Sequence, residues 1–198
     1  MKRARIQPTL FCFRLPAIAA TIAAAILFFG GCQPNGGPEA LPSPSASLLL
    51  DQTRLPDLAT GTVKPLHDYM GRGGLLLLFV DTQCEFSVIA VDDMKKVTAA
   101  LGQHHVSCVV VNLGNPLEDV RTYFAKHDTG SPVVYDETTA TQQAWKVKKI
   151  PTVVLFDAGG SLAYRGGAVW NDVIGAGEQI LKLPPGSIKI DVHGTGFG

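Results

Sequence analysis

The segment from residue 75 to residue 101 constrains the fold of this chain more than any other. Six apolar residues, Leu75–Val80, precede a short polar turn that contains Cys84. Apolar residues then recur at steps of three and four, which predicts a helix over Ser87–Leu101. A strand that is apolar on both faces is typical of the centre of a covered parallel sheet. The sequence therefore predicts a buried strand that leads into a helix, with a cysteine at the junction.

The position of Cys84 has a chemical consequence. The first N–H groups of a helix have no partner within the helix, and the helix dipole is positive at that end. Both features favour a thiolate over a thiol, and the thiolate is the nucleophilic form. Asp81 and Glu85 act in the opposite direction, since negative charge nearby favours the protonated thiol. The sequence thus marks Cys84 as a candidate reactive thiol, with an unreactive leftover cysteine as the alternative.

The rest of the pattern predicts an α/β domain. A second apolar run, Val153–Phe156, follows Ile150-Pro151-Thr152, and we expect it to lie beside Leu75–Val80 in the core. A four-residue turn separates this run from Ser161–Tyr164, which is typical of a β-hairpin. Further strands are predicted at 106–111 and 132–136, and further helices at 139–145 and 171–183. Right-handed crossovers would join the parallel strands, and the final hairpin would be antiparallel.

A second helix start is predicted at Asn115-Pro116-Leu117-Glu118. This order has the form of a capping box, with a cap oxygen at Asn115, a proline in the first turn and a glutamate three residues after the cap. The helix would run to about His127.

Two segments together resemble the thioredoxin superfamily: Cys84-Glu85-Phe86-Ser87 after the apolar strand, and Ile150-Pro151 before the second apolar run. The similarity extends to redoxin domains of the peroxide-reductase and thiol-specific-antioxidant type, and is strongest at 75–97 and 131–167. It implies a thioredoxin-like fold over residues 48–183, with a central mixed sheet flanked by helices. It also implies a cis peptide bond before Pro151, in a loop that faces Cys84.

The resemblance assigns roles to further residues. Where the family has a second cysteine this chain has Ser87, whose hydroxyl can hydrogen-bond a thiolate but cannot displace a mixed disulfide. Asp81 would be a proton acceptor, with a turn-capping aspartate as the alternative. Phe86, Ile150 and Pro151 would bind the substrate.

The N-terminal 31 residues predict a secretion signal. Four basic residues and no acidic ones occur there, and an apolar run from Leu15 to Phe29 is followed by Gly30-Gly31-Cys32. This end resembles the lipobox of bacterial lipoproteins, which implies cleavage before Cys32, lipidation of its thiol, and anchoring to a membrane on the extracytoplasmic side of the cell envelope. A plain transmembrane anchor is the alternative. Residues 32–47, rich in Pro, Gly and Ser, are predicted to form a flexible linker, and residues 184–198 a C-terminal tail.

The composition of the chain limits the kinds of ligand and partner that we expect. From Cys32 onward the chain has 13 basic and 17 acidic residues, which does not favour binding to nucleic acid. Cys108 lies within a predicted strand and is expected to be a buried apolar side chain rather than a disulfide partner of Cys84. The five histidines show no metal-ligand spacing, so we expect neither metal nor cofactor.

These observations lead to one function and two alternatives. The leading hypothesis is a thiol–disulfide oxidoreductase of the cell envelope that acts on protein or small-molecule thiols and disulfides through the single Cys84. An external thiol would then complete its cycle. The alternatives are a one-cysteine peroxiredoxin-like antioxidant and a catalytically silent thioredoxin-fold binding module.

Overall fold

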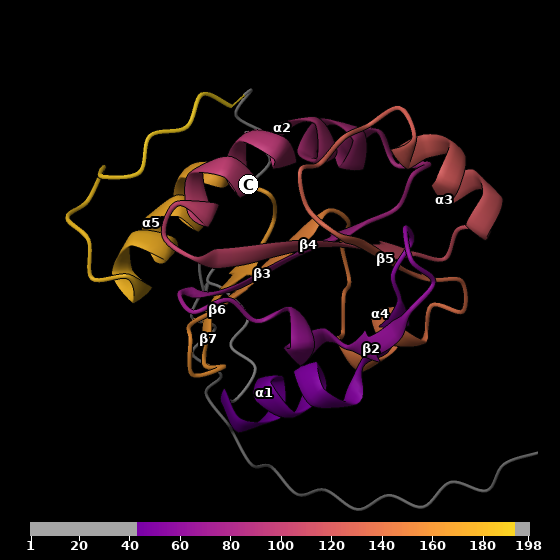
Figure 1. Ribbon diagram of the computed structural model, residues 1–198, viewed down its shortest axis with the longest axis horizontal. Helices are drawn as coiled ribbons and strands as arrows, with labels where there is room; N and C mark the ends of the chain where they lie inside the picture. The colour runs from indigo at the N-terminus through magenta and orange to yellow at the C-terminus, as the bar shows by residue number, and fades with distance from the viewer. Residues whose placement is uncertain (1–42, 193–198) are drawn as a thin grey trace, which may run out of the picture. The chain divides into compact units, whose positions relative to one another are not determined.

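The computed structural model describes residues 43–192, which form an α/β domain around a five-stranded mixed sheet (Figure 1). The strands lie in the order β5-β4-β3-β6-β7. The central strand, β3, is parallel to β4 and antiparallel to β6. The elements of the sheet and of its cover are β3 (Gly74–Val80), α2 (Glu85–Gly102), β4 (Val106–Leu113), α3 (Leu117–Phe124), β5 (Val133–Asp136), α4 (Ala140–Ala144), β6 (Thr152–Phe156), β7 (Leu162–Gly166) and α5 (Trp170–Ile180). This architecture confirms the predicted thioredoxin-like fold class.

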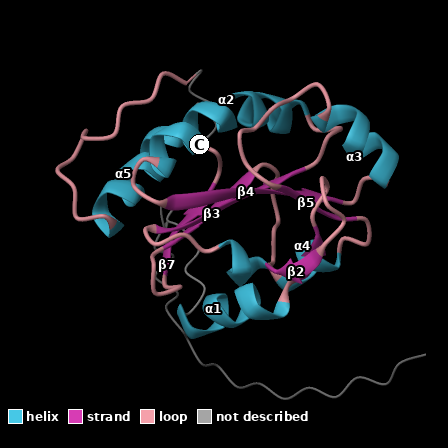
Figure 2. Cartoon of the chain, in the orientation of Figure 1, coloured by secondary structure: helices cyan, strands magenta, loops and turns pink. Residues whose placement is uncertain are grey.

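The segment before the sheet adds a small layer of its own. It consists of α1 (Ser43–Gln52), the two-stranded pair β1 (Arg54–Pro56) and β2 (Val63–Pro65), and the short 3-10 helix η1 (Leu66–Tyr69). Figure 2 shows helices on both sides of the sheet, with α2 and α5 on one side and α1 on the other.

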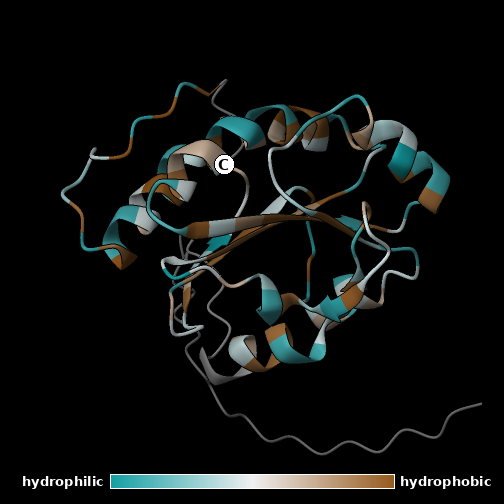
Figure 3. Cartoon of the chain, in the orientation of Figure 1, coloured by the Kyte–Doolittle hydropathy of each residue, from teal (hydrophilic) through white to brown (hydrophobic). Residues whose placement is uncertain are grey.

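The core explains why β3 is apolar on both faces. Leu76, Leu78 and Val80 belong to the cluster under α2 and α5, whereas Leu75, Leu77 and Phe79 belong to the cluster that α1 and η1 cover. All seven residues of β3 are buried. Leu76 is in register with Leu155, so the predicted pairing of the two apolar runs is confirmed. In Figure 3 the central strands of the sheet are mainly brown, which marks them as the apolar layer between the helices.

Two predicted boundaries differ from the structure. Helix α1 begins at Ser43, inside the predicted linker 32–47, and Ala46 is buried against the sheet together with Leu50. Leu49 packs partly against the same core cluster, whereas Leu48 is exposed, so one face of the helix is stabilised by burial. Part of the predicted tail also packs, since Ile188 is buried and the Glu178 carboxylate accepts hydrogen bonds from the backbone N–H groups of Gly186 and Ile188.

The predicted capping box at Asn115 is wrong. Helix α3 begins at Leu117, after Pro116, and has no side-chain cap. The backbone N–H of Leu117 donates instead to Glu137 Oε1 at 2.8 Å. The Asn115 side chain is engaged elsewhere, as described below, and is therefore not available to the helix.

The predicted signal (1–31), most of the linker and Cys32 lie outside the described residues. Within residues 43–192, no helix is long and apolar enough to cross a membrane.

Candidate active site

Cys84 lies at the junction that the sequence predicts. It is the N-cap residue of α2, with an extended backbone (φ −91°, ψ 118°), and its side chain is half-buried. Its thiol donates a hydrogen bond to the carbonyl oxygen of Ile150, with a sulfur–oxygen distance of 3.7 Å. The two residues are 66 positions apart in the chain. The fold therefore brings together the two segments on which the site hypothesis depends.

The loop opposite the thiol has the expected form. The peptide bond between Ile150 and Pro151 is cis, as the family resemblance implied. Both residues are half-buried, so the loop is open to solvent on one side. Ile150 also packs against the core cluster beneath α1. An extended chain could thus meet the thiol and the loop together.

The turn before Cys84 is held by backbone and side-chain hydrogen bonds. The Cys84 N–H donates to the Asp81 carbonyl oxygen at 3.1 Å, and the Gln83 N–H donates to Asp81 Oδ1 at 2.8 Å. The carbonyl oxygen of Cys84 accepts from the N–H groups of Ser87 and Val88, which starts the helix. Asp81 thus caps the turn. Of the two roles considered for Asp81, this arrangement favours the turn-capping aspartate over the proton acceptor.

Ser87 is placed differently from the expectation that it hydrogen-bonds the thiolate. It is 1% exposed, and its Oγ accepts a hydrogen bond from the backbone N–H of Asp81 at 3.2 Å. The hydroxyl therefore ties the first turn of α2 to the end of β3. Its hydrogen-bond partner in the structure is the backbone of the turn and not the sulfur.

Asn115 and Asn112 are site residues that sequence reasoning missed. Asn115 Oδ1 accepts from the Thr82 N–H at 3.0 Å and from Asn112 Nδ2 at 3.0 Å. Asn115 Nδ2 donates to Asp81 Oδ1, also at 3.0 Å. Both asparagines are buried. Together they attach the turn before Cys84 to the end of β4. The polar Asn112, near the end of a mainly apolar strand next to β3, is the sequence signal that could have indicated this attachment.

An apolar surface follows the thiol. Phe86 is 46% exposed and Ile89 is 37% exposed, and both are on the first two turns of α2. Residues three apart on a helix lie on the same face, so the two side chains are neighbours. Large apolar side chains are normally covered, so this surface is a candidate contact area for a substrate or partner.

Cys108 is separate from this site. It lies in the N-terminal half of β4, is 4% exposed, and is a free cysteine like Cys84. Burial raises the pKa of the Cys108 thiol to about 12, because desolvation penalises the thiolate. The prediction of a buried, unpaired side chain is confirmed.

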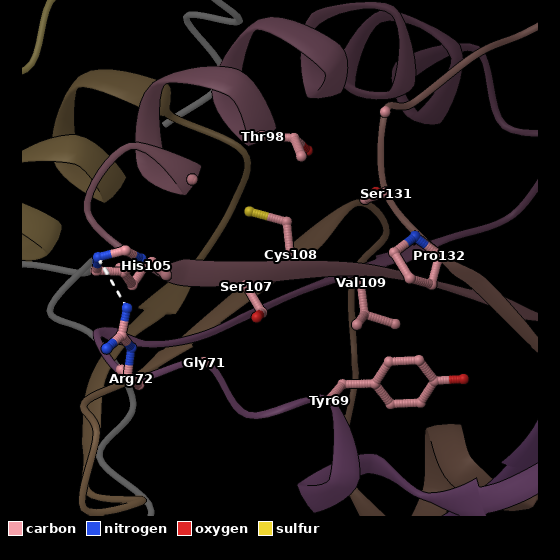
Figure 4. Close-up of a pocket in the computed structure, with 13 residues that line it drawn as sticks. Tyr69, Gly71, Arg72, Thr98, His105, Ser107, Cys108, Val109, Ser131 and Pro132 are labelled. Atoms are coloured by element: carbon pink, nitrogen blue, oxygen red, sulfur yellow. Dashed lines mark hydrogen bonds between the residues drawn. The ribbon is translucent and has the colours of Figure 1, made fainter.

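A cavity of about 410 Å³ lies beside Cys108 (Figure 4). In the figure, Cys108 projects from β4 to the side on which Thr98 of α2 lies, while Val109 projects to the side on which Tyr69 of η1 lies. The cavity borders the N-terminal half of β4, whereas Cys84 follows the C-terminal end of the parallel neighbour β3. The cavity is therefore not the site of the thiol chemistry. Among the described residues, 43–192, no group of three or more His, Cys, Asp or Glu side chains is placed to hold a metal ion.

Comparisons with known proteins agree with the fold. Residues 74–162 match a family model described as thioredoxin-like. A search of curated proteins found no match.

Several solved structures have a similar fold at low sequence identity. A secreted disulfide oxidoreductase of Mycobacterium tuberculosis, homologous to E. coli DsbE, is 16% identical; the match has a TM-score of 0.50 and covers 56% of this chain and 80% of that one. The hypothetical protein SMc02350 of Sinorhizobium meliloti is 20% identical, with a TM-score of 0.59 and coverages of 70% and 85%. The thioredoxin domain of a thiol-disulfide oxidoreductase from Bacteroides vulgatus is 16% identical, with a TM-score of 0.54 and coverages of 62% and 90%. At these identities the similarity establishes the fold.

Proposed function

Because this chain carries a thioredoxin-like domain, we propose that it is a thiol–disulfide oxidoreductase that acts through Cys84 without a second cysteine in the site. The observation that carries the proposal is the contact between the Cys84 thiol and the Ile150 carbonyl, next to the cis peptide bond of Pro151. This contact puts a half-exposed nucleophile against a loop whose backbone can align an extended substrate.

The chemistry is an exchange of disulfide bonds. Cys84 loses its proton to solvent, and the thiolate attacks one sulfur of a substrate disulfide. A bond forms between Cys84 Sγ and that sulfur, the substrate S–S bond breaks, and the second sulfur leaves as a thiolate that takes up a proton. The exchange needs no external oxidant, since one disulfide is consumed and one is formed.

The second half of the cycle needs another thiol. Ser87 occupies the position of a resolving group, but a hydroxyl does not displace a disulfide, and Ser87 Oγ is bound to the Asp81 N–H. An external thiol must therefore attack the mixed disulfide on Cys84 and release the product. We propose that this step is carried out by a partner protein or a small thiol.

The test is a mass measurement of the intact protein after incubation with oxidised glutathione. The proposal predicts a glutathione adduct on Cys84 in the folded protein, assigned by the mass of the peptide that contains it because the sequence also has Cys12 and Cys32. This adduct is absent from a Cys84→Ser variant and persists in the matched Cys108→Ser variant. If Cys84 stays unmodified in the folded protein while the unfolded protein reacts, the thiol is inert and the chain is a binding module.

One specific observation supports that second candidate. Phe86 and Ile89 form an exposed apolar surface directly after Cys84, which could hold a partner without any covalent step. Treatment with peroxide separates the remaining alternative, because a one-cysteine peroxidase forms a sulfenic acid at Cys84 rapidly.

We further propose that the domain works in the cell envelope, tethered through a lipid on Cys32. The support is the Gly30-Gly31-Cys32 order after an apolar run.

A further inference from the structure

We infer that the site is selective for disulfides that carry carboxylates close to the sulfur, and that Lys149, with Lys148 and Lys146, provides this selectivity. The inference rests on the proposed exchange at Cys84 and adds the class of substrate. It starts from the segment Lys146–Lys149, in which three of four residues are lysines and all three side chains are exposed.

This lysine segment, residues 146–149, leads directly into the loop that contacts the thiol. Ile150, whose carbonyl oxygen lies 3.7 Å from Cys84 Sγ, is the next residue. Consecutive Cα atoms are about 3.8 Å apart, so the Cα of Lys149 is within about 10 Å of the sulfur. This Cα–sulfur distance is of the order of the Debye length, which is about 8 Å at physiological salt and longer at lower ionic strength, so the Lys149 charge acts on a substrate at the sulfur most strongly at low salt.

The backbone of the lysine segment is fixed by side chains from other parts of the fold. The Lys146 carbonyl oxygen accepts from Arg165 Nη2 at 2.9 Å, and the Val147 carbonyl oxygen accepts from Gln142 Nε2 at 3.3 Å. The Lys149 carbonyl oxygen accepts from the Thr152 hydroxyl at 2.5 Å. Val147 itself is buried. The charges are therefore presented by a fixed loop, which lowers the entropy cost of using them.

The acidic groups near the thiol belong to other segments than the lysines. Glu85 is exposed on the first turn of α2, and Asp81 is tied into the turn through Gln83 and Asn115. A substrate that extends from Cys84 along the loop thus meets positive charge, and one that extends along α2 meets Glu85. This separation of charge gives a disulfide a preferred direction as well as a preferred charge.

The size of the effect follows from Coulomb's law. Two unit charges about 10 Å apart in water change a rate by about twofold at low ionic strength. Several lysines acting on a substrate with several carboxylates should together give a preference of about tenfold for an anionic over a cationic disulfide. The preference should decline as salt is added, because screening weakens exposed charges.

The experiment measures the rate of adduct formation at Cys84 with three disulfides: oxidised glutathione (anionic), hydroxyethyl disulfide (neutral) and cystamine (cationic). Each is tested at low and high salt on the full chain, on Lys149→Glu, and on Lys96→Glu. Lys96 is also exposed, but it is 12 residues beyond Cys84 and so about 18 Å away along α2. It provides the same change in net charge at a distant place. Two further substrates are peptides with one cysteine, which is flanked by glutamates in the first peptide and by glutamines in the second. Each is used as a disulfide-linked homodimer, and the pair shows whether a protein segment is selected in the same way as a small molecule.

The expected result is a faster reaction with oxidised glutathione than with cystamine, and a loss of most of this preference at high salt. In Lys149→Glu the preference should be about fourfold smaller than in the original chain. Lys96→Glu should keep the preference. Hydroxyethyl disulfide reports any effect of a variant on the Cys84 thiolate itself, so the preference is measured as the rate with each charged disulfide relative to the rate with hydroxyethyl disulfide on the same protein. Equal rates for the three disulfides, or equal effects of the two lysine variants, would overturn the selectivity while leaving the exchange in place. If Cys84 reacts with none of the disulfides, hydroxyethyl disulfide included, the proposed function itself fails and the selectivity fails with it.

Discussion

At the scale of single residues, the site differs from a two-cysteine centre at one position. Ser87 is buried and accepts from the Asp81 N–H, so it contributes to the fold of the turn. Its Cα is three residues from that of Cys84, about one helical turn. A thiol at this position would be within reach of a disulfide on Cys84.

Ser87→Cys should therefore shorten the lifetime of a glutathione adduct on Cys84. The new thiol attacks the mixed disulfide from within the molecule, which the hydroxyl cannot do. The measurement is the fraction of adduct left, by intact mass, after excess oxidised glutathione is removed. Ser87→Ala is the control and should leave the lifetime unchanged. A long-lived adduct in both variants would show that a thiol at position 87 does not reach the disulfide on Cys84.

Cys108 gives a prediction on pH. Burial raises the pKa of its thiol from 9.0 to about 12, so the folded state keeps this proton over a range in which the unfolded state loses it. The contribution of the Cys108 thiol to the free energy of unfolding is fully present below about pH 9. It is lost as the pH rises toward 12, by up to about 1.4 kcal/mol per pH unit. Urea unfolding of the original chain and of Cys108→Ala between pH 8 and pH 10.5 should show a steeper decline for the original chain. Parallel declines would argue against a sequestered thiol.

At the scale of elements, the position of the thiol depends on a loop that does not contain it. Asn115, between β4 and α3, accepts from the Thr82 N–H and donates to Asp81, and so holds the turn between β3 and α2. The sequence alone indicated a helix cap at Asn115, because Asn-Pro-x-Glu is typical of one. The tertiary structure gives this side chain a different partner, and Glu137 serves the helix start instead.

Asn115→Ala should lower the free energy of unfolding by about 1–3 kcal/mol, since it leaves buried polar groups without partners. It should also change the rate at which Cys84 reacts with oxidised glutathione, because the turn loses its attachment to β4. The control is Glu178→Gln, which alters a carboxylate that also accepts from a loop backbone but holds the segment after α5. A change in rate of the same size in the control would mean that only general stability matters.

The pairing of β6 with β3 gives a prediction on stability. Leu155 is fully buried and is in register with Leu76 at the centre of the sheet. Leu155→Ala should reduce the free energy of unfolding by about 2–5 kcal/mol through lost transfer energy and the cavity left behind. Leu48→Ala, at a side chain that is 54% exposed, is the matched control and should cost far less. Denaturant unfolding of both variants measures the difference, and equal costs would place Leu155 outside the core.

At the scale of the whole molecule, the question is where the domain is held. Cys32 is followed by a Pro/Gly/Ser-rich stretch, and the described domain begins with α1 at Ser43. A lipid on Cys32 would keep the domain within a short distance of a membrane surface.

Cys32→Ser should abolish incorporation of labelled fatty acid and should leave a longer, uncleaved precursor. The measurement is lipid labelling in a bacterial host, with Cys12→Ser as the control, because Cys12 lies within the predicted signal. Normal labelling of Cys32→Ser would favour a transmembrane anchor instead.

The sequence by itself determined the features that depend on near neighbours in the chain. The apolar run at 75–80, the spacing of apolar residues after Ser87 and the hairpin turn at 157–160 each specify an element, because burial on a strand or helix follows a short period. Resemblance to a family then indicated that Ile150 and Pro151 face Cys84. Local patterns cannot give a contact between residues 66 positions apart.

Only the tertiary structure decided which polar side chains serve the site. Asn115 and Ser87 hold the turn, α1 extends into the expected linker, and the segment at 186–188 is bound to Glu178. Arg165, Gln142 and Thr152 fix the lysine segment from three different elements. A polar side chain has several possible partners near in sequence. The partner that a polar side chain binds depends on which polar groups lose their contact with water on burial. Those groups are determined only when the whole chain packs.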